Sequence, residues 1–520
     1  MPNYDTDAAW KYHNGTKHSY LSVRAHGHAL DWQNQPLLFK IYPTLEIMRL
    51  PKDFQQTGVA ALSAIVTTGA AKHEGLPNLE QLAQILFFAA GVTKSRKYPG
   101  GETFFRAAAC TGALYEIELY VVCGDLPGLD AGVYHFSVAE FGLRQLRAGD
   151  FRTALVKATG EHPAIVHAPV IMISTGTYWR NAWKYRSRTY RHFGWDNGTI
   201  LANLLAMSEA LHLPAEIVTG FADSEVNRLV DLDTQREVSL SLTPVGYTAA
   251  AANTEAREIT KLGLPIVAYS KEEVEYPAMR QMHEASTLTN AAEVIDWRKR
   301  VSADPQKTAA PATDSIPLRS LPDSGMLPDT VEQVIMRRGS TRKFALEPIP
   351  YEQLSTILDR ATRGLPADFL PRRGAQLNDL YLVANRVEGL AAGAYFYDRT
   401  HHCLQLLKDG SFDNKVRYLG LEQTLPGDAS VAIFFLADLH RALKVLGNRG
   451  YRAAQLEAGM IGGRIYLAAY ALHLGATGLT FYDDEVVHFF SPHAKGKSAI
   501  FLVAVGKSHK PTTTASILAT

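Results

Sequence analysis

Apolar residues recur along the chain in patterns that are typical of helices and strands, and both halves of the chain show the same patterns. Residues 79 to 90 and 351 to 362 carry apolar side chains at i, i+3 and i+4, which predicts two short amphipathic helices. Longer apolar-rich stretches predict helices over 197 to 212 and 458 to 473. The helical elements therefore come in matching pairs.

Runs rich in Val, Ile, Leu and aromatic residues predict strands that also come in pairs. The predicted strands are 117 to 122 with 380 to 384, 168 to 174 with 430 to 437, and two last strands that end at Val245-Gly246 and Val505-Gly506. Mixed helices and strands in each half predict an α+β fold.

The two halves are copies of one unit. ALHLPAEIVTGFADSEV, which begins at 210, aligns with ALHLGATGLTFYDDEV, which begins at 471. GLDAGVYHF, LRQLRAGD and YRHFGWDNGTI align with GLAAGAYFY, LQLLKDGS and YRAAQLEAGMI at the same offset of 261 residues. The short helices align at an offset of 272, so the first half carries about eleven extra residues after its helix. Chance does not keep one register over four blocks, and we infer a tandem duplication.

The repeat divides the chain into five parts. We expect an N-terminal extension (1–58), a first domain (59–250), a connector (251–328), a second domain (329–510) and a tail (511–520). The end of the connector is rich in Pro, Ala, Ser and Thr, which predicts an extended segment. Two equivalent domains in one chain predict an intrachain pseudo-dimer, with a site at the interface that takes residues from each half.

Composition narrows the classes of partner. Hydrophobic residues make up 46% and charged residues 20%, and the formal net charge is +1. No global field points to nucleic acid or to an acidic membrane. No apolar run approaches the roughly 20 residues that span a bilayer, and the polar N-terminus lacks a secretory apolar core. Three scattered cysteines favour a reducing compartment. We expect a cytoplasmic protein with no nucleic-acid or membrane partner; further oligomerisation stays open.

Positive charge is concentrated in RRGSTRKF, at 337 to 344. Arg338, Ser340 and Arg342 alternate there, so their side chains can converge on one anion. Guanidinium groups with a hydroxyl suit a phosphate monoester. A solvated basic face is the other interpretation. The matching place in the first half reads AIVTTGAAK, at 64 to 72, and has no arginine.

Longer stretches around these residues resemble a known family. RRGSTRKFALEPIPYEQLSTIL resembles the opening of the nitroreductase-like flavoproteins, in which an Arg-x-Ser-x-Arg/Lys pattern holds the FMN phosphate. FFRAAACTGALYEIELYVV, GVYHF and KYRSRTYRHF resemble its SagB-type branch, the thiazole/oxazole or azoline dehydrogenases, which oxidise azoline rings in modified peptides. The resemblance covers roughly 60 to 250 and 329 to 508. It implies an antiparallel-type sheet flanked by helices, with FMN at a dimer interface.

The resemblance also implies how the two halves would share one FMN. In the second half it assigns the phosphate to Arg338, Ser340 and Arg342, and the flavin ring to Gln423, Gly478 and Leu479. In the first half it assigns a flavin-contacting loop that contains Cys110, Thr111 and Gly112. The opposite combination has TTGAAK for the arginines and PRRGAQLND, at 371 to 379, for the loop. These complementary losses predict one FMN per chain.

Two positions depart from the family pattern. Cys110 stands where serine is usual, and Glu116 stands where proline is common. The thiol of Cys110 is interpreted either as a redox group or as a buried inert thiol.

Catalytic candidates come from KYRSRTYR. Lys184 and Tyr185 match the Lys-Tyr pair of the azoline dehydrogenases, where the resemblance implies proton transfer. The alternative is that both are surface residues of a basic loop. Arg188 and Arg191 either recognise a carboxylate or have a structural role. The second copy has matching arginines, which favours the structural role.

Three functions remain open from the sequence. The first is an FMN-dependent dehydrogenase or oxidase that acts on a small-molecule, peptide or azoline-like substrate. The second is a nitroreductase or quinone reductase that takes hydride from NAD(P)H, and the third is a non-catalytic flavin-binding scaffold. We expect no metal site, because HGH at 26 to 28 and HHC at 401 to 403 have no second ligand pair at zinc spacing.

Overall fold

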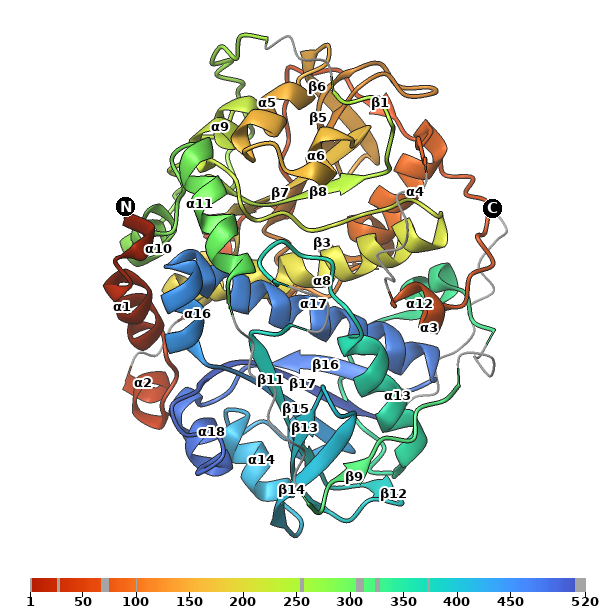
Figure 1. The fold of residues 1–520 in the computed structure, drawn as a ribbon, viewed down its shortest axis with the longest axis vertical. Coiled ribbons are helices and arrows are strands. Elements are labelled where there is room, and N and C mark those ends of the chain that lie inside the picture. Colours follow the sequence, from red (N-terminus) through yellow and green to blue (C-terminus); the bar gives the residue numbers. More distant parts are fainter. Residues whose placement is uncertain are drawn as a thin grey trace.

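Two antiparallel sheets, one from each half of the chain, lie on opposite sides of a central pair of long helices (Figure 1). The computed structural model describes residues 2–25, 29–66, 74–99, 101–252, 257–304, 313–322, 328–371 and 375–509. The central helices are α8 (Thr189–Ala210) and α17 (Arg449–Ala471). Buried apolar residues of both halves form one continuous core cluster around them.

The six strands of the first sheet have counterparts in the same order in the second sheet, which has one further edge strand, β16 (Gly475–Leu479). The first runs β1-β6-β5-β4-β7-β8 and consists of β1 (Met48–Arg49), β4 (Ile117–Cys123), β5 (Gly132–Ser137), β6 (Gly142–Ala148), β7 (Val170–Thr177) and β8 (Glu237–Val245). The second runs β9-β14-β13-β11-β15-β17-β16 and consists of β9 (Ile316–Pro317), β11 (Asn378–Ala384), β13 (Gly393–Asp398), β14 (Cys403–Asp409), β15 (Val431–Ala437), β16 (Gly475–Leu479) and β17 (Ser498–Gly506). The prediction of an α+β chain with two tandem domains in an intrachain pseudo-dimer is confirmed.

Shorter elements surround this frame. The first half adds α3 (Ala61–Ala64), α4 (Leu79–Ala90), the hairpin β2 (Val92–Tyr98) and β3 (Gly101–Arg106), α5 (Arg152–Ala158), α6 (Pro163–Val166), α7 (Tyr178–Tyr185) and α9 (Asp223–Leu229). The second half adds α12 (Val331–Arg337), β10 (Ile349–Pro350), α13 (Tyr351–Thr362), β12 (Val387–Glu388), α14 (Asp413–Leu419), α15 (Leu425–Asp428), α16 (Leu439–Leu446) and α18 (Asp483–Phe490). The predicted helices over 79 to 90 and 351 to 362 are confirmed as α4 and α13.

The long helices begin earlier than the sequence predicts. The predicted starts at 197 and 458 are wrong by about two turns, because α8 begins at Thr189 and α17 at Arg449. The polar residues that obscured these first turns are buried. Arg191 is fully buried, as is Arg449, so their charges face protein partners and the helices continue through them.

The N-terminal residues and the connector join the two halves. Helices α1 (Asp7–Gly15) and α2 (Tyr20–Ala25) precede the first sheet, and α1 is tied to the second half where Asn448 Oδ1 accepts the amide of Ala9. The connector forms α10 (Pro277–Ala285) and α11 (Ala291–Ser302), which the sequence interpretation missed. Of its end, predicted to be extended, residues 305–312 and 323–327 lie outside the described residues.

Glycines allow α8 and α17 to lie unusually close together. A Cβ on Gly198 would come within 2.4 Å of the main chain at Gly459, and one on Gly463 within 2.6 Å of Ala202. Each contact joins residues about 261 positions apart, so the pseudo-two-fold axis runs between these two parallel helices. Only glycine permits this approach.

Buried ion pairs cross the same axis in reciprocal fashion. Asp483 of the second half contacts Arg191 at 2.7 Å and Arg188 at 3.1 Å, both at the start of the first long helix. Asp223 of the first half contacts two arginines of α17, Arg449 at 2.7 Å and Arg452 at 3.0 Å. Burial alone would raise the pKa of Asp483, yet the pKa lies below its ordinary value because the two arginines stabilise the carboxylate. The structural interpretation of Arg188 and Arg191 is therefore the one the contacts support.

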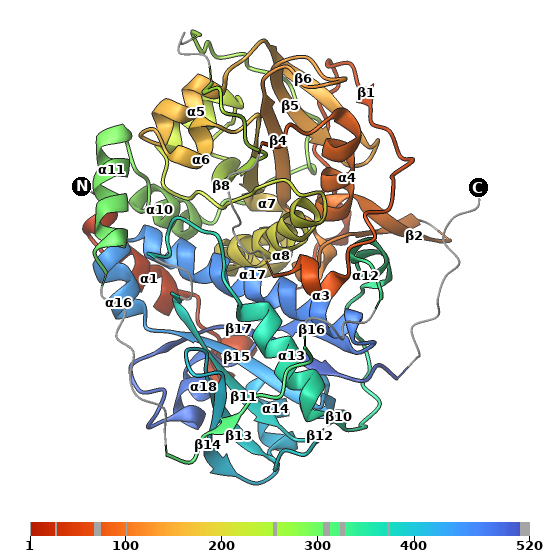
Figure 2. The ribbon, with the colours of Figure 1, turned by 45° about the vertical axis from the view of Figure 1, so that its right-hand side comes forward.

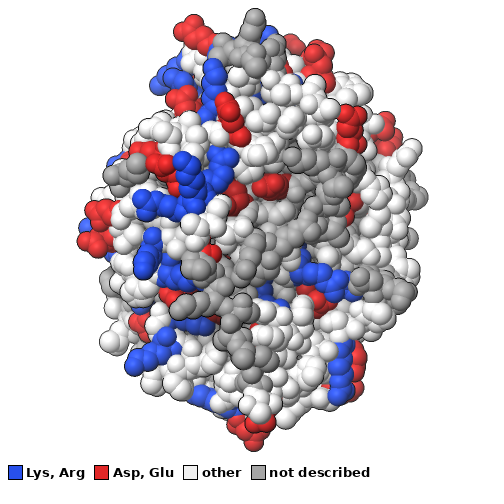
Figure 3. All heavy atoms as spheres, viewed as in Figure 1, with Lys and Arg blue, Asp and Glu red and all other residues white. Residues whose placement is uncertain are grey.

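Charged groups on the surface are of both signs. Lysine, arginine, aspartate and glutamate side chains are interspersed over the face in Figure 3, so that face carries no broad field of a single sign. Within the described residues, no helix combines the length and the apolar character needed to cross a bilayer.

Replacing Gly198 by alanine is expected to lower the free energy of unfolding by about 3 kcal/mol, because the new methyl group would meet main-chain atoms that cannot move aside. Chemical denaturation of the variant and the parent protein measures the difference. Gly15→Ala is the control, since no atom lies within 4 Å of a Cβ built on this glycine of α1. Equal stability of both variants would contradict the close helix contact.

Candidate functional site

The arginine of the predicted anion site reaches across the domain interface. Helix α12 ends at Arg337, after a capping box formed by Thr330 and Gln333. The side chain of Arg338 then donates to two carbonyl groups of the first half, Nη2 to Arg106 at 2.7 Å and Nε to Ala107 at 2.8 Å. Figure 2 shows the β2–β3 hairpin, whose last residue is Arg106, beside α12. Arg338 therefore fixes the first-half loop to the second-half anion site.

The hydroxyl of the anion site is connected to the strand predicted to face the flavin. Ser340 Oγ lies 3.3 Å from the hydroxyl of Tyr466, and this hydroxyl accepts the amide of Gly478 at 2.6 Å. Gly478 and Leu479 are half-buried at the end of β16. Arg342 is exposed two residues beyond Ser340. Ser340 and β16 thus share one hydrogen-bond network.

The first-half loop that contains Cys110, Thr111 and Gly112 is bound to the long helix α8. Asp196 of α8 accepts the amide of Thr111 at 2.9 Å and its hydroxyl, also at 2.9 Å. The Cys110 thiol donates to Asp196 at 3.2 Å. Gly112 has a φ of +66°, and a Cβ there would lie 2.7 Å from the hydroxyl of Tyr185. A small left-handed residue is required where the loop passes under this tyrosine.

The predicted Lys-Tyr pair lies at the end of α7, above the same loop. Tyr185 is half-buried, with its ring 4.7 Å from that of His192, while Lys184 is exposed with its Nζ 5.3 Å from the tyrosine ring. Burial and then the negative charge of Asp196 raise the pKa of Tyr185, whereas Arg342 of the second half lowers it. The structure therefore brings Tyr185 and Arg342 of opposite halves into electrostatic contact. Burial followed by Asp196 raises the pKa of the Cys110 thiol, which favours its protonated form.

Gln423, the remaining residue predicted to contact the flavin ring, forms its side-chain hydrogen bond within its own loop. Gln423 is half-buried, and its Nε2 donates to the carbonyl of Gly420 at 2.9 Å. Thr480, which the prediction did not single out, is the more informative neighbour. Its Oγ1 is buried, and among the described residues it has no hydrogen-bond partner. An orphaned buried hydroxyl beside Gly478 and Leu479 is a suitable donor for a bound polar ligand.

The pseudo-symmetric position in the other half is filled by protein. Thr219 corresponds to Thr480, and both its amide and its hydroxyl donate to Asp368, at 2.9 and 2.8 Å. The amide of Gly220 donates to the other oxygen of this carboxylate at 2.7 Å. Residue 367 forms a parallel bridge with Ile217, which corresponds to Gly478. The segment around Asp368 therefore occupies the edge that β16 leaves accessible.

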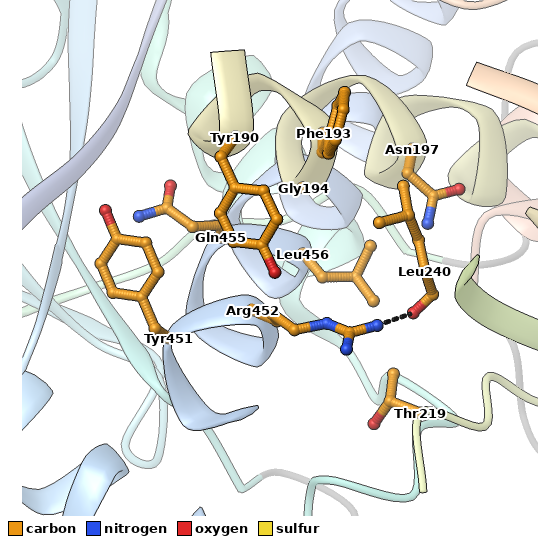
Figure 4. A pocket seen from close by; sticks show the side chains of 10 residues that line it. All are labelled: Tyr190, Phe193, Gly194, Asn197, Thr219, Leu240, Tyr451, Arg452, Gln455 and Leu456. Carbon is orange, nitrogen blue, oxygen red and sulfur yellow. Dashed lines mark hydrogen bonds between the residues drawn. The ribbon is translucent and has the colours of Figure 1, made fainter. Parts of the chain in front are cut away.

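Beside Thr219 the described residues enclose a cavity of about 30 Å³ (Figure 4). The side chain of Arg452 crosses it and donates to the carbonyl of Leu240 at 3.2 Å. This volume is close to that of one water molecule and far too small for a flavin. The TTGAAK residues at 67–72 and residues 372–374 of PRRGAQLND lie outside the described residues, so the obstruction at Asp368 is an observation independent of those losses.

The candidate site fits FMN on structural grounds. Arg338, Ser340 and the exposed Arg342 provide cationic and hydroxyl groups, and Thr480, whose Oγ1 has no hydrogen-bond partner among the described residues, follows Gly478 and Leu479. A phosphate monoester with a polar ring system matches this order of groups.

Comparisons with known proteins agree with this arrangement. Residues 335–507 match the model of the nitroreductase family. “Putative nitroreductase MJ1384” of Methanocaldococcus jannaschii is 29% identical over 163 residues, which are 30% of this chain and 81% of that protein. The trifolitoxin-processing protein TfxB of Rhizobium leguminosarum bv. trifolii is 32% identical over 175 residues, which are 32% of this chain and 47% of TfxB. The aligned part thus spans about half the length of TfxB.

The fold itself extends over both halves in a solved relative. A crystal structure from Anabaena variabilis, assigned provisionally to the same class, covers 96% of this chain and 99% of its own, with a TM-score of 0.75 at 23% identity. The chain therefore contains a nitroreductase-type domain in a fold shared from end to end with that protein. These findings support an oxidoreductase.

Removing the carboxylate of Asp368 tests the obstruction of the second position. Asp368→Ala is expected to lower the free energy of unfolding by about 2 kcal/mol, because the amides of Thr219 and Gly220 lose their acceptor. Urea denaturation measures this loss. Flavin content is expected to stay unchanged, and a fall in flavin per chain would show that the flavin site had been assigned to the wrong side.

Proposed function

We propose that the chain is an FMN-dependent oxidoreductase with one FMN per chain, bound where the two domains meet. The proposal assigns the phosphate to Arg338, Ser340 and Arg342, and the flavin edge to Gly478 and Leu479. The observation that carries it is the pair of hydrogen bonds from Arg338 to the first-half carbonyls, which assembles one site from both halves. The units 59–250 and 329–510 are proposed as its two domains.

Each residue group has a separate role in this proposal. Bound FMN supplies a hydride acceptor or donor at N5. The loop of Cys110, Thr111 and Gly112 closes the first-half side of the ring and is kept rigid by Asp196. Gln423 and Thr480 provide polar contacts from the second half. The domain contact excludes water from the side of the ring opposite the substrate.

The substrate class we favour is a peptide or azoline-like molecule. The name of TfxB, a trifolitoxin-processing protein, supports a peptide-modifying role, and so does the Lys184-Tyr185 pair. Burial and the neighbouring carboxylate keep Tyr185 protonated at neutral pH. Tyr185 therefore acts by passing a proton on through its hydroxyl group, while exposed Lys184 contacts the substrate side.

A second candidate is an NAD(P)H-dependent nitroreductase or quinone reductase. The similarity to MJ1384 favours it, and NAD(P)H would then be a transient co-substrate. Anaerobic mixing separates the two candidates, because bleaching of the flavin by NAD(P)H is expected only of the reductase. A third candidate is a non-catalytic flavin-binding scaffold; the retained Arg338, Ser340 and Arg342 argue only against full loss of the flavin site.

Arg342→Ala tests the phosphate assignment. Loss of one charge-assisted contact to the phosphate is expected to weaken FMN binding about 10-fold to 100-fold. The fold is expected to stay intact because Arg342 is exposed. Fluorescence titration of the flavin-free protein with FMN measures the affinity. Lys343→Ala is the matched control, an exposed cation one residue away and outside the Arg-Ser-Arg alternation; equal weakening in both variants would contradict a specific phosphate contact.

A further inference from the structure

Two buried carboxyl groups lie under the flavin-contacting loop, and the proposed function uses neither as a proton carrier. Asp196 is 4% exposed and Glu116 is fully buried. The Cys110 thiol lies between them, 3.2 Å from Asp196 Oδ2 and 3.5 Å from Glu116 Oε2. The Sγ atom of Cys110 and one carboxyl oxygen each of Glu116 and Asp196 all lie within 4.8 Å of one another. Glu116 lies close enough to Asp196 to raise the pKa of the Asp196 carboxyl.

Two buried carboxyl groups this close favour a proton on one of them. Oε1 of Glu116 is buried and, within the described part of the chain, has no hydrogen-bond partner. The groups that bear on the pair are the Cys110 thiol, the Tyr185 hydroxyl and two more distant cations, Arg106 near Cys110 and Arg342 near Tyr185. Burial and then Glu116 raise the pKa of Asp196. Two negative charges this close repel each other strongly, which favours a proton on the Asp196 carboxyl.

The second half provides an internal comparison. Glu457 occupies the position of Asp196 on the other long helix, and it too holds a loop by accepting the amide of Asn378 at 2.7 Å. Its partner is the guanidinium of Arg399, 3.5 Å away, so this carboxylate is neutralised by a cation. The structural task of holding the loop therefore needs no second carboxyl group. Glu116 is an addition specific to the half that carries the flavin-contacting loop.

The pair is also placed where a proton can reach it. Asp196 binds the amide of Thr111, and the next residue of the loop, Gly112, lies against the Tyr185 hydroxyl. Beside Cys110 and Asp196 is a cavity of about 10 Å³, also lined by Arg106 and Tyr115. This size is at the lower limit for one water molecule with polar partners.

We propose that Glu116 and Asp196 are the proton reservoir of the flavin site: the pair carries one shared proton at rest and takes up a second when the flavin is reduced. This inference rests on the proposed function and adds two positioning residues to it. The pair acts through Cys110 and Tyr185 and does not touch the substrate.

The proposed step balances in atoms and charge. One substrate bond gives its hydrogen with the electron pair to FMN, which is the two-electron oxidant, and a second substrate bond releases a proton. The Tyr185 oxygen receives this proton while its own proton passes to the pair. The remaining carboxylate becomes a carboxylic acid and Tyr185 ends unchanged, so the one negative charge that the pair loses would be carried by the bound hydride acceptor.

Proton uptake on reduction of the bound flavin tests the reservoir without knowledge of the substrate. In weakly buffered solution, dithionite-free photoreduction of the holoprotein is followed with an indicator dye. The parent protein is expected to take up about one proton more per flavin than the isosteric double variant Glu116→Gln with Asp196→Asn. Amide groups keep the loop contacts, so a purely structural role would leave proton uptake unchanged. Glu457→Gln is the control and is expected to match the parent protein.

The outcomes separate the reservoir from the proposed function. Equal proton uptake by flavin-loaded parent and double variant would overturn the reservoir alone, whereas a parent protein that binds no FMN would overturn both. Infrared spectroscopy gives a second test that does not depend on the double variant. A protonated carboxyl band is expected at neutral pH and is expected to disappear in Glu116→Gln. Absence of that band, or a stoichiometric metal ion on Cys110, Glu116 and Asp196, would overturn the shared proton.

Discussion

The structure depends on two buried ion-pair clusters that join the halves in reciprocal fashion. Asp223 of the first half is held by arginines at the start of α17, and Asp483 of the second half by arginines at the start of α8. A buried charge without its partner is strongly unfavourable, so separating the halves would leave both clusters unpaired. Each aspartate follows the segment that would face a flavin in its own half. The clusters therefore set the position of both potential flavin edges relative to the opposite domain.

Within this symmetric frame the two sites differ through a few side chains. At one edge the hydroxyl of Thr480 is buried without a partner among the described residues, and Arg338 connects the anion site to the opposite loop. At the other edge Asp368 accepts hydrogen bonds from the corresponding threonine, and the described residues beside it enclose a cavity of about 30 Å³. Symmetry accounts for the reciprocal contacts of the pseudo-dimer, whereas the asymmetry distinguishes the proposed flavin site from its counterpart. A duplicated chain can alter one site without disturbing the other, which identical subunits cannot do.

Much of the frame could be predicted from the sequence because it follows local rules. Apolar spacing predicts the bounds of α4 and α13, and the constant offset between matching segments predicts the repeat. The first turns of the long helices were missed because buried arginines resemble surface residues in sequence. Arg191 is identified as a core residue only once Asp483 is placed beside it. Such a partner, nearly 300 residues away, leaves no local signal.

The candidate site also combines features with a local sequence signal and features that depend on residues far away in the chain. Arg338, Ser340 and Arg342 are predicted from their spacing and from the family resemblance, since their chemistry is local. The obstruction by Asp368 was not found, because it depends on the path of the main chain around 366 to 368. Glu116 was noticed only as a departure from the family pattern, and its contact with Asp196 gives that departure a physical meaning.

Flavin content per chain tests the central claim most directly. The flavin is released by denaturation from freshly purified protein saturated with FMN, identified, and compared with the protein concentration. Two edges in one frame, of which one is filled by the segment around Asp368, predict close to one FMN per chain. Two FMN per chain would contradict the account, because the second edge would then have to open despite its hydrogen bonds to Asp368.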